Sequence, residues 1–232
     1  MRKLIAIHQP NFLPWPGFFH KWMLADAMVL LDTVQYEKNE WQNRNRIKTA
    51  SGAQWITVPV NYRYPQKINE VTIADRRWVR KVCRSIEQSY AKAPCFEAYW
   101  PSVREVLNRP CVQLKDLNMA LIRLIGDAVG CTSPLWLASD LEADHADPTE
   151  RLLKLCMALD ADAYLSGQEG RTYLQWERFA QSGLALYFQQ IEAPEYSQLH
   201  GDFVPYLSVL DMLFNTGADA AEIIRGMGGM VR

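Results

Sequence analysis

The chain has 232 residues, of which 49% are hydrophobic and 22% are charged, and its formal net charge is −1. This composition is typical of a globular protein, and the charge balance argues against a general binder of nucleic acid or of membrane surfaces. The sequence contains no apolar run near the roughly 20 residues that cross a bilayer. Its five cysteines are scattered and lack Cys-x-x-Cys spacing, which favours reduced thiols and a cytoplasmic location.

The first predicted element is a short buried strand at residues 3–7, which stops at a polar loop stiffened by three prolines. His8, Gln9 and Asn11 stand where this strand ends. A histidine at such a place is a candidate general base, because its ordinary pKa lies near neutrality. The alternative is a hydrogen-bonded structural histidine.

A helix with an apolar face is predicted from Gly17, and the apolar run at 28–34 predicts a second strand that ends at Gln35. A helical connection of this length suits a parallel right-handed crossover. Ligands bind beyond the carboxyl ends of strands in open α/β sheets, so the polar strand exits are candidate site residues.

The next polar stretch reads as the first strand of a β-hairpin near 43–60, with its turn at 50–52. Its candidate binding residues are Gln42, Asn43, Arg44, Asn45 and Arg46. Period two places Arg44, Arg46 and Lys48 on one strand face, which suits a phosphate or carboxylate. A solvated edge strand that uses charge to prevent aggregation is the alternative.

A short strand at 68–73 and a helical block near 75–130 follow. The first helix of this block, 75–90, is rich in arginine, which indicates either a solvated face or a docking surface for an acidic partner. No flexible linker flanks the block. We therefore expect the α/β domain to be single, covering residues 1–232.

The α/β pattern resumes with a strand at 134–138 and an acidic loop. This loop contains three residues of metal-binding type, Asp144, His145 and Asp147. Asp147 is better explained as a helix N-cap, because a proline and a capping-box glutamate follow it. The sequence therefore predicts no metal site.

A strand at 163–165 is followed by a glycine-containing turn and a helix at 172–181. The turn supplies the candidate binding residues Ser166, Gly167, Gly170 and Arg171, because glycines permit close backbone approach and helix N-termini attract anions. A plain tight turn is the alternative.

The last strand is predicted at 184–191, and residues 227–232 are expected to fray. A polar loop near 196–202 contributes His200 as a catalytic candidate and Asp202 as a binding candidate. The predicted fold class is thus α/β, with a mostly parallel open sheet, flanking helices, the β-hairpin and the helical block.

Several motifs of the chain resemble those of the WbqC-like proteins. They are His8-Gln-Pro-Asn-Phe-Leu-Pro-Trp15, Val34-Gln-Tyr-Glu-Lys-Asn-Glu-Trp-Gln-Asn-Arg-Asn-Arg-Ile47, Tyr164-Leu-Ser-Gly167 and Leu199-His-Gly-Asp-Phe203. Members of this family occur in bacterial polysaccharide and O-antigen gene clusters, and a glycine-transferring role has been proposed for some. The resemblance therefore implies a transferase of surface-polysaccharide biosynthesis.

Taken together, the residues and the resemblance suggest transfer of a small acyl or aminoacyl group to a nucleotide-linked or lipid-linked sugar. Arg44, Arg46 and Arg171 would hold phosphate. His8 would deprotonate the acceptor. Asn11, the third catalytic candidate beside His8 and His200, would orient the acceptor together with Gln35 and Asn43. Two alternatives stay open. The layout of strand, histidine loop and helix is similar to that of the nucleotidylyltransferases, and the chain also suits a non-catalytic partner of a glycan-assembly enzyme. No motif requires a cofactor.

Overall fold

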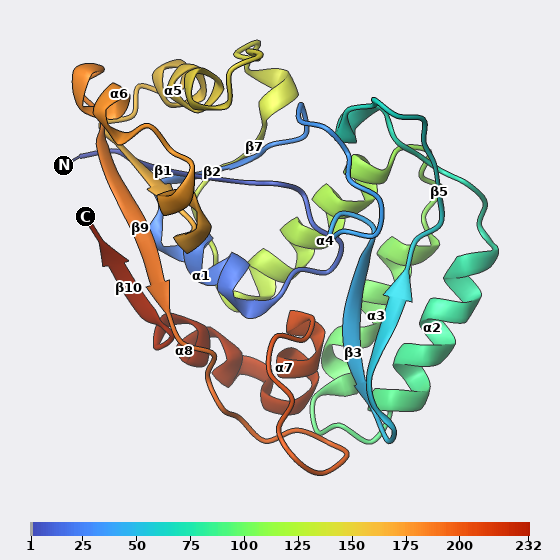
Figure 1. Ribbon diagram of the computed structural model, residues 1–232. Coiled ribbons are helices and arrows are strands. Elements are labelled where there is room, and N and C mark those ends of the chain that lie inside the picture. The colour runs from blue at the N-terminus through green and yellow to red at the C-terminus, as the bar shows by residue number, and fades with distance from the viewer. Residues whose placement is uncertain (1) are drawn as a thin grey trace.

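The computed structural model describes residues 2–232 and shows a six-stranded sheet with helices on both faces (Figure 1). The strands are β1 (Leu4–His8), β2 (Ala27–Leu30), β7 (Leu135–Leu137), β8 (Ala163–Ser166), β9 (Ala185–Ile191) and β10 (Gly228–Val231). Their spatial order is β10-β9-β8-β1-β2-β7. The first five in chain order are parallel, and β10 pairs antiparallel with β9. The predicted mostly parallel sheet is confirmed.

Alternate residues of β1 enter two different hydrophobic clusters. Leu4 and Ala6 face the larger cluster, whereas Ile5 and Ile7 face a smaller one beneath α5 (Pro148–Ala158) and α6 (Trp176–Gln181). All four are at most 7% exposed, so β1 is buried on both faces, as a central parallel strand must be.

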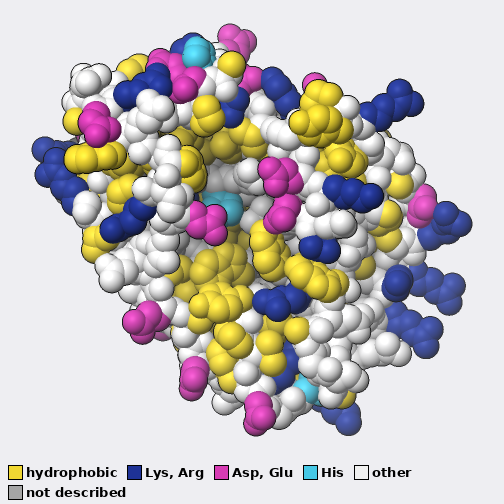
Figure 2. All heavy atoms as spheres, viewed as in Figure 1, with side chains coloured by type: hydrophobic (Ala, Val, Ile, Leu, Met, Phe, Trp, Pro, Cys, Tyr) yellow, Lys and Arg dark blue, Asp and Glu magenta, His cyan; other side chains and the backbone are white. Residues whose placement is uncertain are grey.

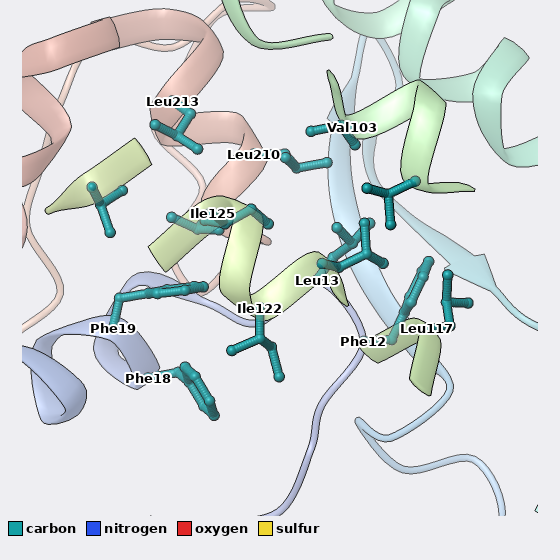
Figure 3. Close-up of a cluster of buried hydrophobic side chains, with 14 of the residues drawn as sticks. Phe12, Leu13, Phe18, Phe19, Val103, Leu117, Ile122, Ile125, Leu210 and Leu213 are labelled. Carbon is teal, nitrogen blue, oxygen red and sulfur yellow. The ribbon is translucent and has the colours of Figure 1, made fainter. Parts of the chain in front are cut away.

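The larger cluster joins the sheet to α1 (Pro16–Leu24), α4 (Leu114–Val129), α7 (Val209–Thr216) and α8 (Ala220–Arg225). In Figure 3, Phe12 lies beside Leu117 of α4, Phe18 and Phe19 of α1 lie near Ile122 and Ile125, and Leu210 and Leu213 of α7 complete the cluster. Helices α1 and α4 approach closely because Gly126 has no side chain: a Cβ there would lie 2.3 Å from the Trp22 ring. The cluster therefore fixes α1 under the end of β1.

A β-hairpin of β3 (Arg44–Thr49) and β4 (Gly52–Thr57) packs beside α2 (Arg77–Tyr90), which packs in turn against α3 (Phe96–Asn108) (Figure 1). The predicted hairpin and helical block are both confirmed. Ile47 of β3 and Ile56 of β4 are buried in the larger cluster, which joins the hairpin to the core.

The prediction of one strand at 68–73 was wrong. Ile68–Glu70 forms a 3-10 turn, and only β6 (Thr72–Ile73) is extended, paired with β5 (Val60–Asn61). The turn arises because the Glu70 side chain accepts a hydrogen bond from the Lys67 backbone N–H.

Two predictions near the end of the chain were also wrong. Residues 228–231 form β10 and do not fray, because β9 offers them an unpaired edge. The helix predicted at 172–181 begins only at Trp176, since a 3-10 turn occupies Gln168–Thr172.

Candidate functional site

The order of the strands reverses between β1 and β8. From β1 the chain proceeds outward through β2 to β7, then crosses to β8 and continues outward through β9 to β10. This is the 3-2-1-4-5-6 order of doubly wound nucleotide-binding sheets, apart from the antiparallel last strand. Ligands of such sheets bind at the reversal, beyond the carboxyl ends of the strands.

The pairing of β1 with β8 stops before either strand ends. The last paired residues are Ala6 and Leu165, whereas His8 pairs onward with Leu30 of β2 and Ser166 pairs with Phe188 of β9. The two central strands therefore diverge at their carboxyl ends. We call this place the β1/β8 crevice.

His8 lies at the end of β1, and its Nδ1 is 3.0 Å from the Gln9 carbonyl oxygen. Because a carbonyl only accepts, Nδ1 carries the proton and Nε2 keeps its lone pair. Burial and the positive charge of Lys21 lower the pKa of His8 to about 4. His8 is therefore a neutral hydrogen-bond acceptor at Nε2, with a pKa well below the near-neutral value expected from the sequence.

Lys21 is the charged side chain of this region that sequence reasoning missed. It lies on α1, is only 3% exposed, and donates from Nζ to the Ile7 carbonyl oxygen at 2.8 Å. Burial lowers its pKa to about 7. Its spacing from Phe18 and Ala25, three and four residues away, was the available signal, because it places a lysine on the helix face that packs inward.

The loop after β1 is held by side chains from the hairpin and from α4. Asn45 Nδ2 donates to the carbonyl oxygens of Phe12 and Leu13, at 3.2 and 2.7 Å. Asn118 of α4 donates to the carbonyl oxygens of Pro10 and Gln42, both at 2.7 Å. These bonds hold Leu13 at φ +45°, a left-handed conformation that a leucine rarely adopts. The loop is therefore fixed before any ligand arrives.

The predicted polar residues of this region differ in their contacts. Gln42 donates to Gln9 Oε1 at 2.5 Å, which joins the polar run before β3 to the residue next to His8. Asn43 donates to the Val58 carbonyl oxygen, and Gln35 to that of Tyr36. Asn11, at 7% exposure, makes no side-chain hydrogen bond within residues 2–232. Asn11 therefore has its whole amide free to contact a ligand, whereas Gln42 and Asn43 keep only their side-chain oxygens without a partner.

Arg44 and Arg46 lie over an exposed tryptophan of the hairpin. Their guanidinium carbons are 4.1 and 5.8 Å from the centre of the Trp55 ring, which packs against Trp41 at 5.3 Å. Arg46 also reaches the Tyr206 carbonyl oxygen at 3.3 Å. We call Trp41, Arg44, Arg46 and Trp55 the arginine–tryptophan face. Aromatic rings and guanidinium groups suit a sugar ring and a phosphate, respectively.

The face seen in Figure 2 is hollowed in its upper half. A histidine side chain lies at the floor of the hollow, acidic side chains stand at its rim, and hydrophobic and basic side chains lie below it. The hollow therefore has a histidine at its floor and hydrophobic and basic side chains beside it.

The turn after β8 separates its candidate residues. Ser166 is buried at 1% exposure, and a Cβ on Gly170 would lie 2.0 Å from its Oγ, so Gly170 is required for packing. Gly167 has open space around it. The guanidinium of Arg171 lies 4.8 Å from the centre of the Phe188 ring. Arg171 lines a hollow of about 790 Å³ along β9, which does not include His8.

His200 and Asp202 belong to a loop that clasps the far end of the hairpin. His200 Nε2 is 2.7 Å from the Ser89 carbonyl oxygen at the end of α2. Lys48 Nζ donates to the carbonyl oxygens of Gly201 and Asp202, at 3.0 and 2.5 Å. These contacts join the loop to β3 and α2, and none of them involves the loop after β1.

The acidic loop and the basic helix also have defined contacts. Asp147 accepts from the Glu150 backbone N–H at 2.7 Å, so the predicted N-cap is confirmed. No group of three or more His, Cys, Asp or Glu residues with metal-binding geometry occurs in residues 2–232. Arg76, Arg80, Arg84 and Arg104 line a hollow of about 410 Å³ between α2 and α3.

Comparisons with known proteins cover nearly the whole chain. The sequence model described as the WbqC-like protein family matches residues 9–223. An uncharacterized protein of Mycobacterium tuberculosis is 36% identical over 227 residues, which are 96% of this chain and 98% of that protein. No solved structure matches the chain. Within residues 2–232, none of the helices has the length and apolar character needed to cross a membrane.

Proposed function

Because the chain belongs to the WbqC-like protein family, we propose that it is a group-transfer enzyme of bacterial surface-polysaccharide assembly. It moves a small acyl or aminoacyl group onto a sugar that is carried on a phosphate, as in a nucleotide sugar. The single observation that carries this proposal is the reversal of strand order at β1 and β8, with His8 at the strand end.

The arginine–tryptophan face supports a phosphorylated sugar as the ligand. Arg44 Nε is buried without a hydrogen-bond partner within residues 2–232, and its guanidinium carbon lies 4.1 Å from the centre of the Trp55 ring. It is therefore positioned and available for a phosphate. The hydrogen bond from Gln42 to Gln9 joins the segment before this face to the residue next to His8.

The chemistry assigned to His8 follows from its neutral state. In an acyl transfer the acceptor oxygen or nitrogen attacks the acyl carbon, the bond to the donor's leaving group breaks, and the acceptor's proton ends on that leaving group. His8 Nε2 accepts the hydrogen bond of the attacking O–H or N–H and so aims its lone pair at the acyl carbon. Asn11, close by in the same loop, orients the sugar.

Binding is tested by thermal unfolding of the purified protein with nucleotide sugars, ATP and glycine. A ligand at about 100 times its Kd stabilises the fold by roughly 2.7 kcal/mol, which is readily measured. We expect a nucleotide sugar to bind, and Arg44→Gln to weaken it. The matched control is Arg80→Gln, which removes an exposed arginine of α2. Equal affinity in the wild type and in both Arg44→Gln and His8→Gln would exclude the proposed site.

Transfer itself is measured as the mass gained by the sugar when acyl thioesters or aminoacyl esters are supplied. Wild type should show the gain, and His8→Gln should lose most of it. Nucleotidyl transfer is the second candidate, because the strand order is that of nucleotide-binding sheets. Stabilisation by ATP and not by any nucleotide sugar would favour that candidate.

A further inference from the structure

We propose that Lys21 is an anion-binding residue at the base of the β1/β8 crevice, where its ammonium group pairs with a phosphate or carboxylate of the ligand. This inference rests on the proposed function, since it specifies which part of the substrate reaches the crevice. The resemblance and the family match do not assign a role to this lysine.

The environment of Lys21 provides an incomplete set of partners for an ammonium group. Nζ has three donors, and one hydrogen bond is formed, to the Ile7 carbonyl oxygen at 2.8 Å. No carboxylate within residues 2–232 lies within 4.0 Å of Nζ. A lysine that is 97% removed from solvent and unpaired is unusual, because burying an uncompensated charge is costly.

The Nζ atom of Lys21 lies where a ligand is expected to bind, so the ligand can supply the anion that the protein does not. Ile7 lies one residue beyond the last β1/β8 pair, so its carbonyl group lies where the two strands diverge. Nζ therefore lies at the reversal of strand order, where ligands of such sheets bind. Helix α1 packs against α8, whose charged residues Glu222 and Arg225 are paired with each other at 2.8 Å. His8 is the other titratable group whose charge interacts with Lys21.

A purely structural role would use Lys21 only to satisfy the Ile7 carbonyl group. Such a role needs one neutral donor and does not need an amine with two further donors in a buried site. The low pKa of Lys21, about 7, is the expected property of an ammonium group that lacks its counter-ion. An anion bound beside Nζ supplies that counter-ion and returns the pKa toward its ordinary value.

The first experiment measures binding of four probes by calorimetry: pyrophosphate, inorganic phosphate, acetate and a nucleotide sugar. Lys21→Met keeps the length of the side chain and removes its charge. Lys81→Met, on the exposed face of α2, is the matched control. We expect at least ten-fold weaker binding in Lys21→Met, which corresponds to about 1.4 kcal/mol, because the variant loses a hydrogen bond to a charged group. Lys81→Met should bind the probes as tightly as wild type.

The probes separate the two sources of the anion and the two proposals. If phosphate or pyrophosphate binds more weakly to Lys21→Met than to wild type, the partner of Lys21 is the phosphate of the sugar. If acetate binds more weakly to the variant, the partner is a carboxylate. If a nucleotide sugar binds wild type and Lys21→Met equally, the anion role is excluded and the proposed function stands. If only the simple anions bind, through Lys21, the proposed sugar ligand is excluded and the anion role stands.

A second measurement keeps the inference testable if Lys21→Met does not fold. Binding of acetate or of a nucleotide sugar to wild type at pH 8, measured in two buffers of different ionisation enthalpy, should show proton uptake. His8 does not contribute there, because its pKa is about 4. Binding with no proton uptake at pH 8 and with no loss of affinity as the pH rises to about 11 would overturn the role of Lys21, because an ammonium group that holds the anion must either gain its proton on binding or lose it at high pH.

Discussion

At the scale of single residues, the ends of β1 and α1 bring two basic side chains into one buried place. Neither His8 nor Lys21 forms an ion pair with an acidic side chain within residues 2–232, and both have lowered pKa values. Each is therefore more easily protonated in the unfolded chain than in the folded protein. This difference makes stability depend on pH in two separate windows.

The first window belongs to His8. Its pKa is 6.5 in a model peptide and about 4 in the fold, so the unfolded chain binds more protons between these values. Stability should fall as the pH drops from about 6.5 to about 4, by roughly 3 kcal/mol in total. Urea unfolding of wild type and His8→Gln at several pH values measures this. A ring NMR titration of His8 with a midpoint near 6.5 would contradict it.

The second window belongs to Lys21, whose pKa is 10.5 in a model peptide and about 7 in the fold. The unfolded chain again binds more protons, so stability should rise with pH from about 7 upward, by at most about 1.4 kcal/mol per pH unit. Lys21→Met lacks this contribution. The free energy of unfolding of wild type should therefore rise relative to that of Lys21→Met between about pH 7 and 10, as urea unfolding curves of the two proteins will show. A constant difference would mean that Lys21 is charged throughout.

Sequence reasoning located polar residues at strand ends but did not separate their roles. Asn43 and Asn45 looked like His8 and Asn11 in the sequence, yet their amides bind backbone carbonyl groups of other segments. Such bonds join residues far apart in the chain, so no local pattern predicts them. Lys21 was missed for the opposite reason, since a lysine on a helix is ordinarily assumed to be solvated.

At the scale of elements, the hairpin supports the loop after β1. Asn45 is 2% exposed and donates to two carbonyl groups of that loop. Asn45→Ala should lower the free energy of unfolding by about 2 kcal/mol, because both acceptors lose their partner in a buried place. Asn61→Ala, at an exposed position of β5, is the control and should change it by less than about 0.5 kcal/mol. Equal effects in urea unfolding would contradict this view of the hairpin.

Elements with a strong local pattern were predicted well, and elements defined by a distant partner were not. The hairpin turn and the capped helix at Asp147 carry their signals within a few residues. Strand β10 has the sequence Gly228-Gly-Met-Val231, which has no strand signal, and it forms because β9 is available beside it. Pairing with β9, and not the local sequence, therefore determines that residues 228–231 form a strand.

At the scale of the whole molecule, the loop with His200 acts as a clasp between the hairpin and α2. We expect His200→Ala to lower the free energy of unfolding by about 1 kcal/mol and to leave ligand affinity unchanged. His8→Gln should weaken ligand binding and leave the free energy of unfolding nearly unchanged. Calorimetric affinities and urea midpoints of the two variants measure this contrast. A loss of affinity in His200→Ala equal to that in His8→Gln would place His200 in the ligand site.

The larger hydrophobic cluster contains residues from Leu4 to Met227 and includes the hairpin and the helical block. We therefore propose that the chain unfolds as one cooperative unit, in keeping with a single domain. Far-ultraviolet circular dichroism and tryptophan fluorescence should give coincident urea transitions. Two separated transitions would show that the helical block is independently stable.

The pairing of β1 with β8 also determines when the site can exist during synthesis. Lys3 and Asp162, which bond at the start of these strands, are 159 residues apart. At roughly 5–20 residues per second, a ribosome needs on the order of ten seconds to supply the second strand after the first. Until then the apolar side chains of β1 lack one neighbour, and a nascent chain in this state is a natural client for a chaperone. The crevice is therefore among the last features of the molecule to form.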